Sequence, residues 1–125
     1  MTVSTRRLIE IPSQQDGVFP AQCPSRTLLD HVTSKWGVLV LLALGVDVMR
    51  WSELRRRIEG ISEKMLAQTL RTLEADGLVR RVAQPVVPPH VEYNLTESGQ
   101  EVHDRLLPLM EWVGANADRI IAREG

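Results

Sequence analysis

The sequence predicts a mainly α-helical protein with one small β-hairpin, an α+β fold, and three observations lead to this prediction. The stretch 62–77 has the periodicity of an amphipathic helix with a capping residue at each end. A shorter helical stretch precedes it across a tight turn, and two short apolar stretches with the character of strands follow it. The chain has 125 residues, a length that fits one domain.

The stretch 62–77 should form an amphipathic helix. Ser62 occupies the N-cap position and Gly77 the position of a left-handed terminator, so both ends are specified. At about 100° per residue, one arc of this helix is suited to burial: Leu66, Thr69, Leu70 and Leu73. The opposite arc carries hydrogen-bond donors and positive charge: Lys64, Ala67, Gln68 and Arg71. This polar arc is the candidate functional face.

The segments around this helix predict a winged helix-turn-helix. The short helix 52–58 is joined to it by a turn at 59–61 that contains a glycine, and two short helices with such a turn make a helix-turn-helix. Residues 78–82 and 91–95 have the character of strands, and the prolines between them favour a hairpin, the wing. In such a fold, the polar arc of 62–77 would face the major groove of DNA.

The formal net charge of the chain is −1, which argues against a protein that coats nucleic acid indiscriminately. The charge is unevenly distributed, however. From Arg50 to Arg81 there are eight basic and five acidic residues, a local charge of +3 that leaves −4 for the rest of the chain. The arginine run 55–57 has the alternative interpretation of a solvated face, but beside a helix-turn-helix phosphate contact is the better one. The expected DNA contacts are Arg55, Arg56, Ser62, Lys64, Gln68, Arg71, Arg81 and His90.

Composition is that of an ordinary soluble globular protein, with 43% hydrophobic and 25% charged residues. The most apolar run, 38–46, is shorter than the roughly 20 residues that a membrane span requires, so we expect a buried helix and no membrane partner. The start of the chain has no export signal, which favours the cytoplasm. The single cysteine, Cys23, excludes an internal disulfide and agrees with a reducing compartment.

Two further helices should precede the helix-turn-helix. Residues 1–22 lack periodicity and are interpreted as an N-terminal tail or arm, and residues 23–125 as the winged-helix domain. Residues 25–33 have apolar side chains at helical spacing. Residues 34–44 are apolar on nearly every side, so they should form the central buried helix, ended by Gly45.

The chain should end in a long helix over 97–122, with Thr96 as its N-cap. Its apolar stripe is longer than one winged-helix core can cover: Val102, Leu106, Leu109, Met110, Val113, Ala117 and Ile120. One interpretation is packing on the first helix of the same chain. We favour a homodimer, because operators with two-fold symmetry are bound by two-fold proteins. The expected dimer interface is Leu28, Leu106, Leu109, Met110 and Val113, while Trp112 is interpreted as core.

A series of short motifs, taken in order and spacing, resembles one protein family. The motifs are Cys23-Pro24, Ser34-Lys35-Trp36, Trp51-Ser52-Glu53-Leu54-Arg55-Arg56, Gly60-Ile61-Ser62, Lys64-Met65-Leu66, Leu70-Arg71, Leu73-Glu74, Asp76-Gly77-Leu78-Val79, Val87-Pro88-Pro89, Val91-Glu92-Tyr93, Leu95-Thr96 and Gly99. They run from Cys23 to about Trp112 and resemble the HxlR-type winged helix-turn-helix transcriptional regulators. The sequence departs from the family pattern at Gln84 and His90, where an aromatic residue and an arginine are frequent.

The resemblance implies a dimeric bacterial transcription factor that binds a near-palindromic DNA operator. The helix 62–77 would read DNA, the wing would touch the flanking minor groove or backbone, and the first and last helices would form the dimer. Many members also have a cysteine near the first helix that senses oxidants or electrophiles, and Cys23 occupies that place. A free cysteine is otherwise an inert small hydrophobe, but a helix N-terminus favours the thiolate. An oxidant or small-molecule inducer is therefore one expectation.

Other chemistry is not indicated. His31, His90 and His103 fall on separate predicted elements with no i, i+4 pair, so we expect no metal site. No phosphate loop, nucleophile elbow or paired-carboxylate motif is present, so an enzyme is the weakest interpretation and no cofactor is expected. The remaining alternative is a winged-helix adaptor that binds protein and not DNA, which would require an apolar face at 64–71.

Overall fold

The computed structural model describes residues 19–122, and the chain divides after Ser34 into two compact units. The first unit contains α2 (Pro24–Val32), which lies within one residue of the predicted first helix at each end. Pro24 stands at the first helical position, where its missing N–H leaves no intrahelical bond unmade. Residues 1–18 of the predicted arm lie outside the described residues.

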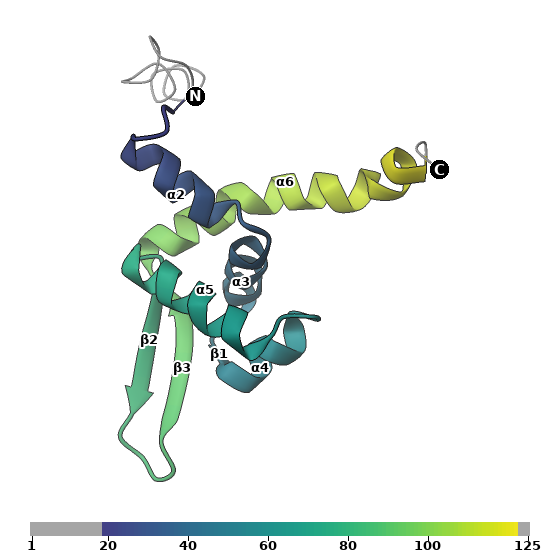
Figure 1. The fold of residues 1–125 in the computed structure, drawn as a ribbon. Helices are drawn as coiled ribbons and strands as arrows, with labels where there is room; N and C mark the ends of the chain where they lie inside the picture. Colours follow the sequence, from purple (N-terminus) through teal and green to yellow (C-terminus); the bar gives the residue numbers. More distant parts are fainter. Residues whose placement is uncertain (1–18, 123–125) are drawn as a thin grey trace. The chain divides into compact units, whose positions relative to one another are not determined.

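The second unit is a winged helix-turn-helix, and Figure 1 shows its elements. They are α3 (Lys35–Val46), β1 (Met49–Arg50), α4 (Trp51–Arg57), α5 (Glu63–Ala75), β2 (Val79–Gln84), β3 (His90–Leu95) and α6 (Glu97–Ala122). Helices α4 and α5 form the helix-turn-helix, and β2 and β3 form the wing. The predicted fold class, mainly α with a small β-hairpin, is confirmed.

The sheet has three antiparallel strands in the order β1-β3-β2, one strand more than the sequence predicted. The hairpin is the only strand pair that the sequence predicts, whereas Met49 and Arg50 pair with Tyr93 and Glu92 of β3. A two-residue strand is too short to show alternation in the sequence, and its partner lies more than 40 residues away. The strand β1 therefore ties the start of the helix-turn-helix to the wing.

The core of this unit is centred on α3, as predicted. Val40 and Leu41 of α3 are fully buried, together with Leu54 of α4 and Leu66 of α5. The buried arc of α5 contains the four residues expected from its periodicity: Leu66, Thr69, Leu70 and Leu73. No single helix in the described residues is long and apolar enough to cross a membrane.

The helix α3 continues to Val46, so the prediction that Gly45 ends it is wrong. A Cβ atom at Gly45 would fall on the imidazole ring of His103 from α6. The glycine is therefore a packing residue, not a helix terminator. Its missing side chain lets the buried His103 ring lie directly against the backbone of α3.

The predicted caps of α5 and α6 are present. The Ser62 hydroxyl accepts a hydrogen bond from the backbone N–H of Met65 at 3.1 Å, and Gly77 has a φ of +77° beyond the end of α5. The Thr96 hydroxyl accepts from the backbone N–H of Gly99 at 3.0 Å and donates to the carbonyl of Gly77 at 2.6 Å. One threonine therefore joins the end of α5 to the start of α6.

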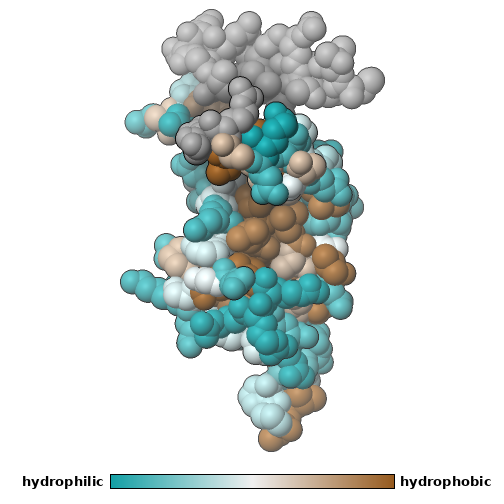
Figure 2. Space-filling view, turned by 90° about the vertical axis from the view of Figure 1, so that its right-hand side faces the viewer, coloured by the Kyte–Doolittle hydropathy of each residue, from teal (hydrophilic) through white to brown (hydrophobic). Residues whose placement is uncertain are grey.

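The helix α6 differs between its two halves. Its buried residues, Gly99, His103 and Leu106, all lie in the first half. From the middle of α6 onward large apolar side chains are exposed: Leu109 is 55% and Trp112 53% exposed, so the interpretation of Trp112 as core is wrong for the single chain. The face drawn in Figure 2 carries a broad hydrophobic area bordered by hydrophilic side chains. Large apolar side chains of α6 therefore remain exposed in the single chain.

Candidate nucleic-acid interface

The exposed arc of α5 presents three polar side chains: Lys64, Gln68 and Arg71. None of them makes a hydrogen bond or an ion pair with another residue in the part of the chain that the structure describes. The opposite arc of the same helix is buried, which fixes the rotation of α5 about its axis. These donors are therefore directed outward and available to a ligand.

The last turn of α4 is basic, but one of its arginines has a partner. The last turn of α4 contains Arg55, Arg56 and Arg57, all exposed. Arg55 Nη1 lies 3.2 Å from Glu63 Oε2 in the first turn of α5. The Ser62 hydroxyl is bound to the Met65 amide as a cap, so its side chain is committed to the helix. Arg56 and Arg57 have no such partner within residues 19–122.

The structure places the two predicted wing contacts on opposite faces of the sheet. Arg81 is the cross-strand partner of Tyr93, which is buried, so Arg81 shares the face that packs on the core. His90 is the partner of Gln84 and lies two residues from Glu92, on the other face. The sequence predicted both as DNA contacts because both lie in the wing. Arg81 and His90 therefore cannot belong to one contact surface.

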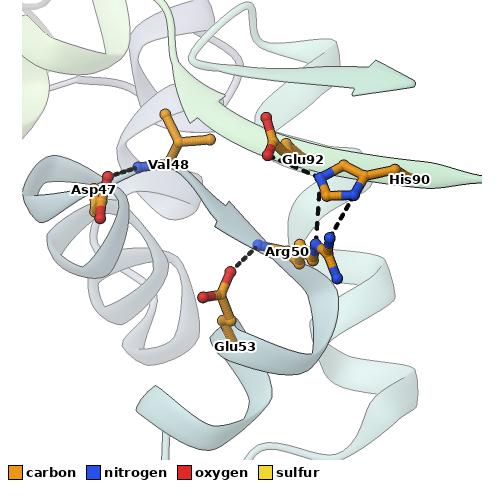
Figure 3. A network of polar contacts seen from close by, with 6 residues as sticks. All are labelled: Asp47, Val48, Arg50, Glu53, His90 and Glu92. Atoms are coloured by element: carbon orange, nitrogen blue, oxygen red, sulfur yellow. Dashed lines mark hydrogen bonds and ion pairs between the residues drawn. The ribbon is translucent and has the colours of Figure 1, made fainter. Parts of the chain in front are cut away.

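His90 belongs to a network that the sequence did not reveal (Figure 3). Its Nε2 atom lies 2.9 Å from Glu92 Oε2, and Arg50 approaches both ring nitrogens, with Arg50 Nε 3.2 Å from His90 Nε2 and Arg50 Nη2 beside His90 Nδ1. The backbone N–H of Arg50 donates to Glu53 Oε1 of α4 at 2.8 Å. Arg50 thus connects α4, β1 and β3. No local sequence pattern indicates the contact between Arg50 and His90, because it depends on the pairing of β1 with β3.

The tip of the wing is uncharged. Between β2 and β3, Val86 is 51% and Val87 99% exposed, and they are flanked by Pro85, Pro88 and Pro89. The end of the hairpin is accordingly one of the hydrophobic areas in Figure 2. Charge in the wing is confined to its base.

Cys23 lies at the N-cap position of α2 within the first unit and is partly exposed. Hydrogen bonds from the side chain and the backbone N–H of Ser25 lower the pKa of the Cys23 thiol, with a smaller contribution from the backbone N–H of Arg26. Partial desolvation opposes them and raises the pKa. The balance favours the thiolate, the reactive form of a cysteine.

Within the described residues, no group of three or more His, Cys, Asp and Glu side chains could hold a metal ion. The buried His103 contacts Asp104 instead, at 3.2 Å between Nδ1 and Oδ1. A hydrogen bond from the Gln100 side chain, and next the bond from His103, lower the pKa of Asp104. These three side chains stabilise the first half of α6.

Comparison with known proteins identifies the family. A family model described as HxlR-like helix-turn-helix matches residues 31–121. The chain belongs to the HxlR-like helix-turn-helix family. Relatives of this chain are described as HTH-type transcriptional regulators, and the protein is a transcriptional regulator of the HxlR type.

The regions aligned with relatives extend over most of this chain. An uncharacterized HTH-type transcriptional regulator, YtfH of Escherichia coli strain K12, is 51% identical over 109 residues, which are 87% of this chain and 86% of YtfH. The solved structure of YtfH from Salmonella typhimurium is 53% identical, with a TM-score of 0.79 over 85% of this chain and 95% of that one.

Two further similar structures are those of an oxidized and of a diamide-treated regulator. The redox regulator HypR in its oxidized form is 38% identical, with a TM-score of 0.70 over 75% of this chain and 97% of HypR. YodB from Bacillus subtilis, treated with diamide, is 30% identical, with a TM-score of 0.65 over 74% of this chain and 93% of YodB.

Proposed function

We propose that this HxlR-type regulator binds a specific, near-palindromic DNA operator through α5. The observation that supports this most is the contrast between the two arcs of α5. One arc is buried in the core, and the other directs Lys64, Gln68 and Arg71 outward without partners among the described residues. A protein-interaction adaptor would need an apolar face at this place, and this face is polar and basic.

The side chains of the interface suit different parts of a DNA duplex. Gln68 has the donor and acceptor needed to pair with the edge of an adenine, and Lys64 and Arg71 suit guanine edges or phosphates. Arg56 is exposed and cationic at the end of α4, where it suits a phosphate. Arg55 forms an ion pair with Glu63 in the free protein, so Arg55 must leave the Glu63 carboxylate before it can contact a DNA phosphate.

The proposal is tested by selecting duplexes from random-sequence DNA with the wild-type protein and then measuring variants on them. Gln68→Ala should relax the preference at one base position, at a cost of about 1–3 kcal/mol of discrimination. Arg56→Ala should weaken binding to all sequences and lower the salt slope by about one. Arg119→Ala, on the far half of α6, is the control and should change neither. A wild-type protein that selects no sequence would contradict the proposal.

We further propose a homodimer formed by the second half of α6 and by α2. The apolar side chains that stay exposed on α6 include Leu109, Trp112 and Val113, and Leu28 of α2 is 43% exposed. Leu106 was also expected in the interface, but it is only 9% exposed in the single chain and has little surface left to bury in a dimer. A two-fold dimer would present two copies of α5 to a two-fold operator.

Cys23 is proposed as the site at which an oxidant or electrophile changes DNA binding. The lowered pKa of its thiol and the redox regulators among the similar structures support this proposal. Since Cys23 is the single cysteine of the chain, its oxidation must end in a sulfenic acid, a mixed disulfide with a small thiol, or a disulfide to Cys23 of a second copy. Diamide should weaken operator binding by the wild type and leave Cys23→Ser unchanged. Equal binding by both after treatment would make Cys23 a structural residue.

Such a regulator acts on the chromosome, so we also propose a cytoplasmic location.

A further inference from the structure

The wing beyond Glu92 is a two-stranded ribbon with an open edge. The strand β1 pairs with β3 only at Met49 with Tyr93 and at Arg50 with Glu92. From Val91 outward, β3 has β2 as its only strand partner within the described residues. Two-stranded ribbons are marginally stable and twist more strongly than larger sheets. The angle of the wing tip relative to α5 therefore depends on what holds β3 at Glu92 and beyond it.

The side chain of Arg50 continues from the short β1 strand along β3 toward the wing tip. Arg50 is the cross-strand partner of Glu92, and His90 is the diagonal neighbour on the same face. The guanidinium of Arg50 reaches across to the His90 ring, two residues beyond the last β1–β3 pair (Figure 3). The Arg50 side chain thus contacts β3 beyond the end of β1, on the edge where a longer β1 strand would pair.

The same residue is fixed to the helix-turn-helix. The Arg50 backbone N–H donates to Glu53 Oε1 at 2.8 Å, which closes the corner between β1 and α4. The chain enters α4 at the next residue. The wing and the helix-turn-helix are therefore connected through both the backbone and the side chain of Arg50.

The chemistry of His90 fits a structural role better than a phosphate contact. Both ring nitrogens of His90 have partners: Nε2 lies 2.9 Å from Glu92 Oε2 and 3.2 Å from Arg50 Nε, and Nδ1 lies beside Arg50 Nη2. The His90 side chain is 23% exposed, and Glu92 beside it would repel a phosphate.

We propose that Arg50, His90 and Glu92 form a brace that sets the angle of the wing relative to the recognition helix α5, and that His90 acts as a positioning residue and not as a DNA contact. This inference rests on the proposed function, because a fixed angle affects binding only if α5 and the wing meet the same DNA. The brace would let the uncharged wing tip reach the DNA that flanks each half-site without an ordering cost at binding.

A binding experiment tests the brace with duplexes that wild-type protein selects from random-sequence DNA. Each duplex is used at full length and after its flanks have been trimmed, and the ratio of the two affinities is measured. His90→Ala should lower this ratio by about fivefold, the size expected when a few side chains must be ordered on binding. His90→Gln should restore the ratio, because a carboxamide also has one donor and one acceptor. Gln84→Ala, directly opposite His90 on β2, is the matched control and should keep the wild-type ratio.

The outcomes separate this inference from the proposed function. A wild-type protein that selects no sequence contradicts the proposed function itself. A wild-type protein with a flank-dependent affinity that His90→Ala retains overturns the brace. A ratio that falls in His90→Ala and is not restored by His90→Gln also overturns it, since this result indicates direct contact of the imidazole with DNA. If His90→Ala does not fold, Glu92→Ala removes the other end of the network and takes its place.

A second measurement tests the brace without DNA. In a Cys23→Ser background, spin labels at Val87→Cys on the wing tip and Ser52→Cys on α4 report the distance between wing and helix-turn-helix. The distance distribution should be narrow with His90 and clearly broader with His90→Ala. Equal widths in the two proteins would overturn the brace, whatever the DNA measurements show.

Discussion

Two glycines of α6 should respond in opposite ways to the same substitution. Gly99 is buried in the first turn of α6, and a Cβ atom there would fall on the carbonyl oxygen of Leu78, with the Leu95 Cδ2 atom 3.2 Å away. Gly114 lies in the exposed second half of the helix, and a Cβ atom there would meet nothing within 4 Å. The pair isolates the contact between α6 and the base of the wing, because the chemical change and the helix are the same.

The contacts allow the two effects to be estimated. Gly99→Ala forces atoms into a packed site, which costs about 1–3 kcal/mol. It also displaces the Leu78 carbonyl, which accepts the backbone N–H of Thr96 at 3.0 Å, a bond with a net contribution of about 1 kcal/mol. The better helix propensity of alanine offsets about 1 kcal/mol. We expect a net loss of about 2 kcal/mol for Gly99→Ala and a gain of up to about 1 kcal/mol for Gly114→Ala.

Urea denaturation at one fixed protein concentration measures both effects, since the stability of a dimer depends on concentration. With a slope of about 1–3 kcal/mol/M, Gly99→Ala should lower the midpoint by about 1 M. Gly114→Ala should raise it by a smaller amount. A midpoint that Gly99→Ala raises or leaves unchanged would refute the steric argument and the packing of α6 on Leu78.

Three further predictions concern the dimer, the cysteine and the ion pair. Trp112→Glu should place a charge in the apolar half of α6 and give monomers in sedimentation, while a wild type that is already monomeric at micromolar concentration would contradict the dimer. The rate of Cys23 alkylation by iodoacetamide should rise at lower pH than for free cysteine, because the lowered pKa yields thiolate at lower pH, and Ser25→Ala should move the profile back up. Glu63→Gln should strengthen binding to all duplexes and steepen the salt slope by up to about one, since Arg55 is released; an unchanged slope would count against phosphate contact by Arg55.

Local signals allowed the recognition helix to be predicted from the sequence. The periodicity of α5 depends on spacing within one helix, and its caps at Ser62 and Gly77 depend on neighbours within a few residues. The long helix α6 was predicted with its observed bounds for the same reason, since Thr96 caps it locally. These features need no knowledge of how distant segments pack.

Contacts between distant segments could not be predicted in this way. The pairing of β1 with β3 joins residues more than 40 positions apart, so the sequence offered no sign that Arg50 would meet His90. Gly45 fits a helix terminator by local rules, and only the His103 ring from α6 explains why the helix continues through it. Trp112 has the hydrophobicity of a core residue, but its side chain is 53% exposed in the single chain.

The two halves of α6 suggest how a signal at the proposed dimer interface would reach DNA. The first half is fixed to α3 by His103 against Gly45 and to the base of the wing by Gly99 against Leu78. A change in how two copies meet along the second half would therefore move each winged helix as one body. Half-sites of an operator are separated by a fixed distance of about 34 Å, so a small rotation at the interface displaces both recognition helices from their grooves. On this argument a regulator of this kind needs no rearrangement within its winged helix, and α5 should have the same structure in the bound and released states.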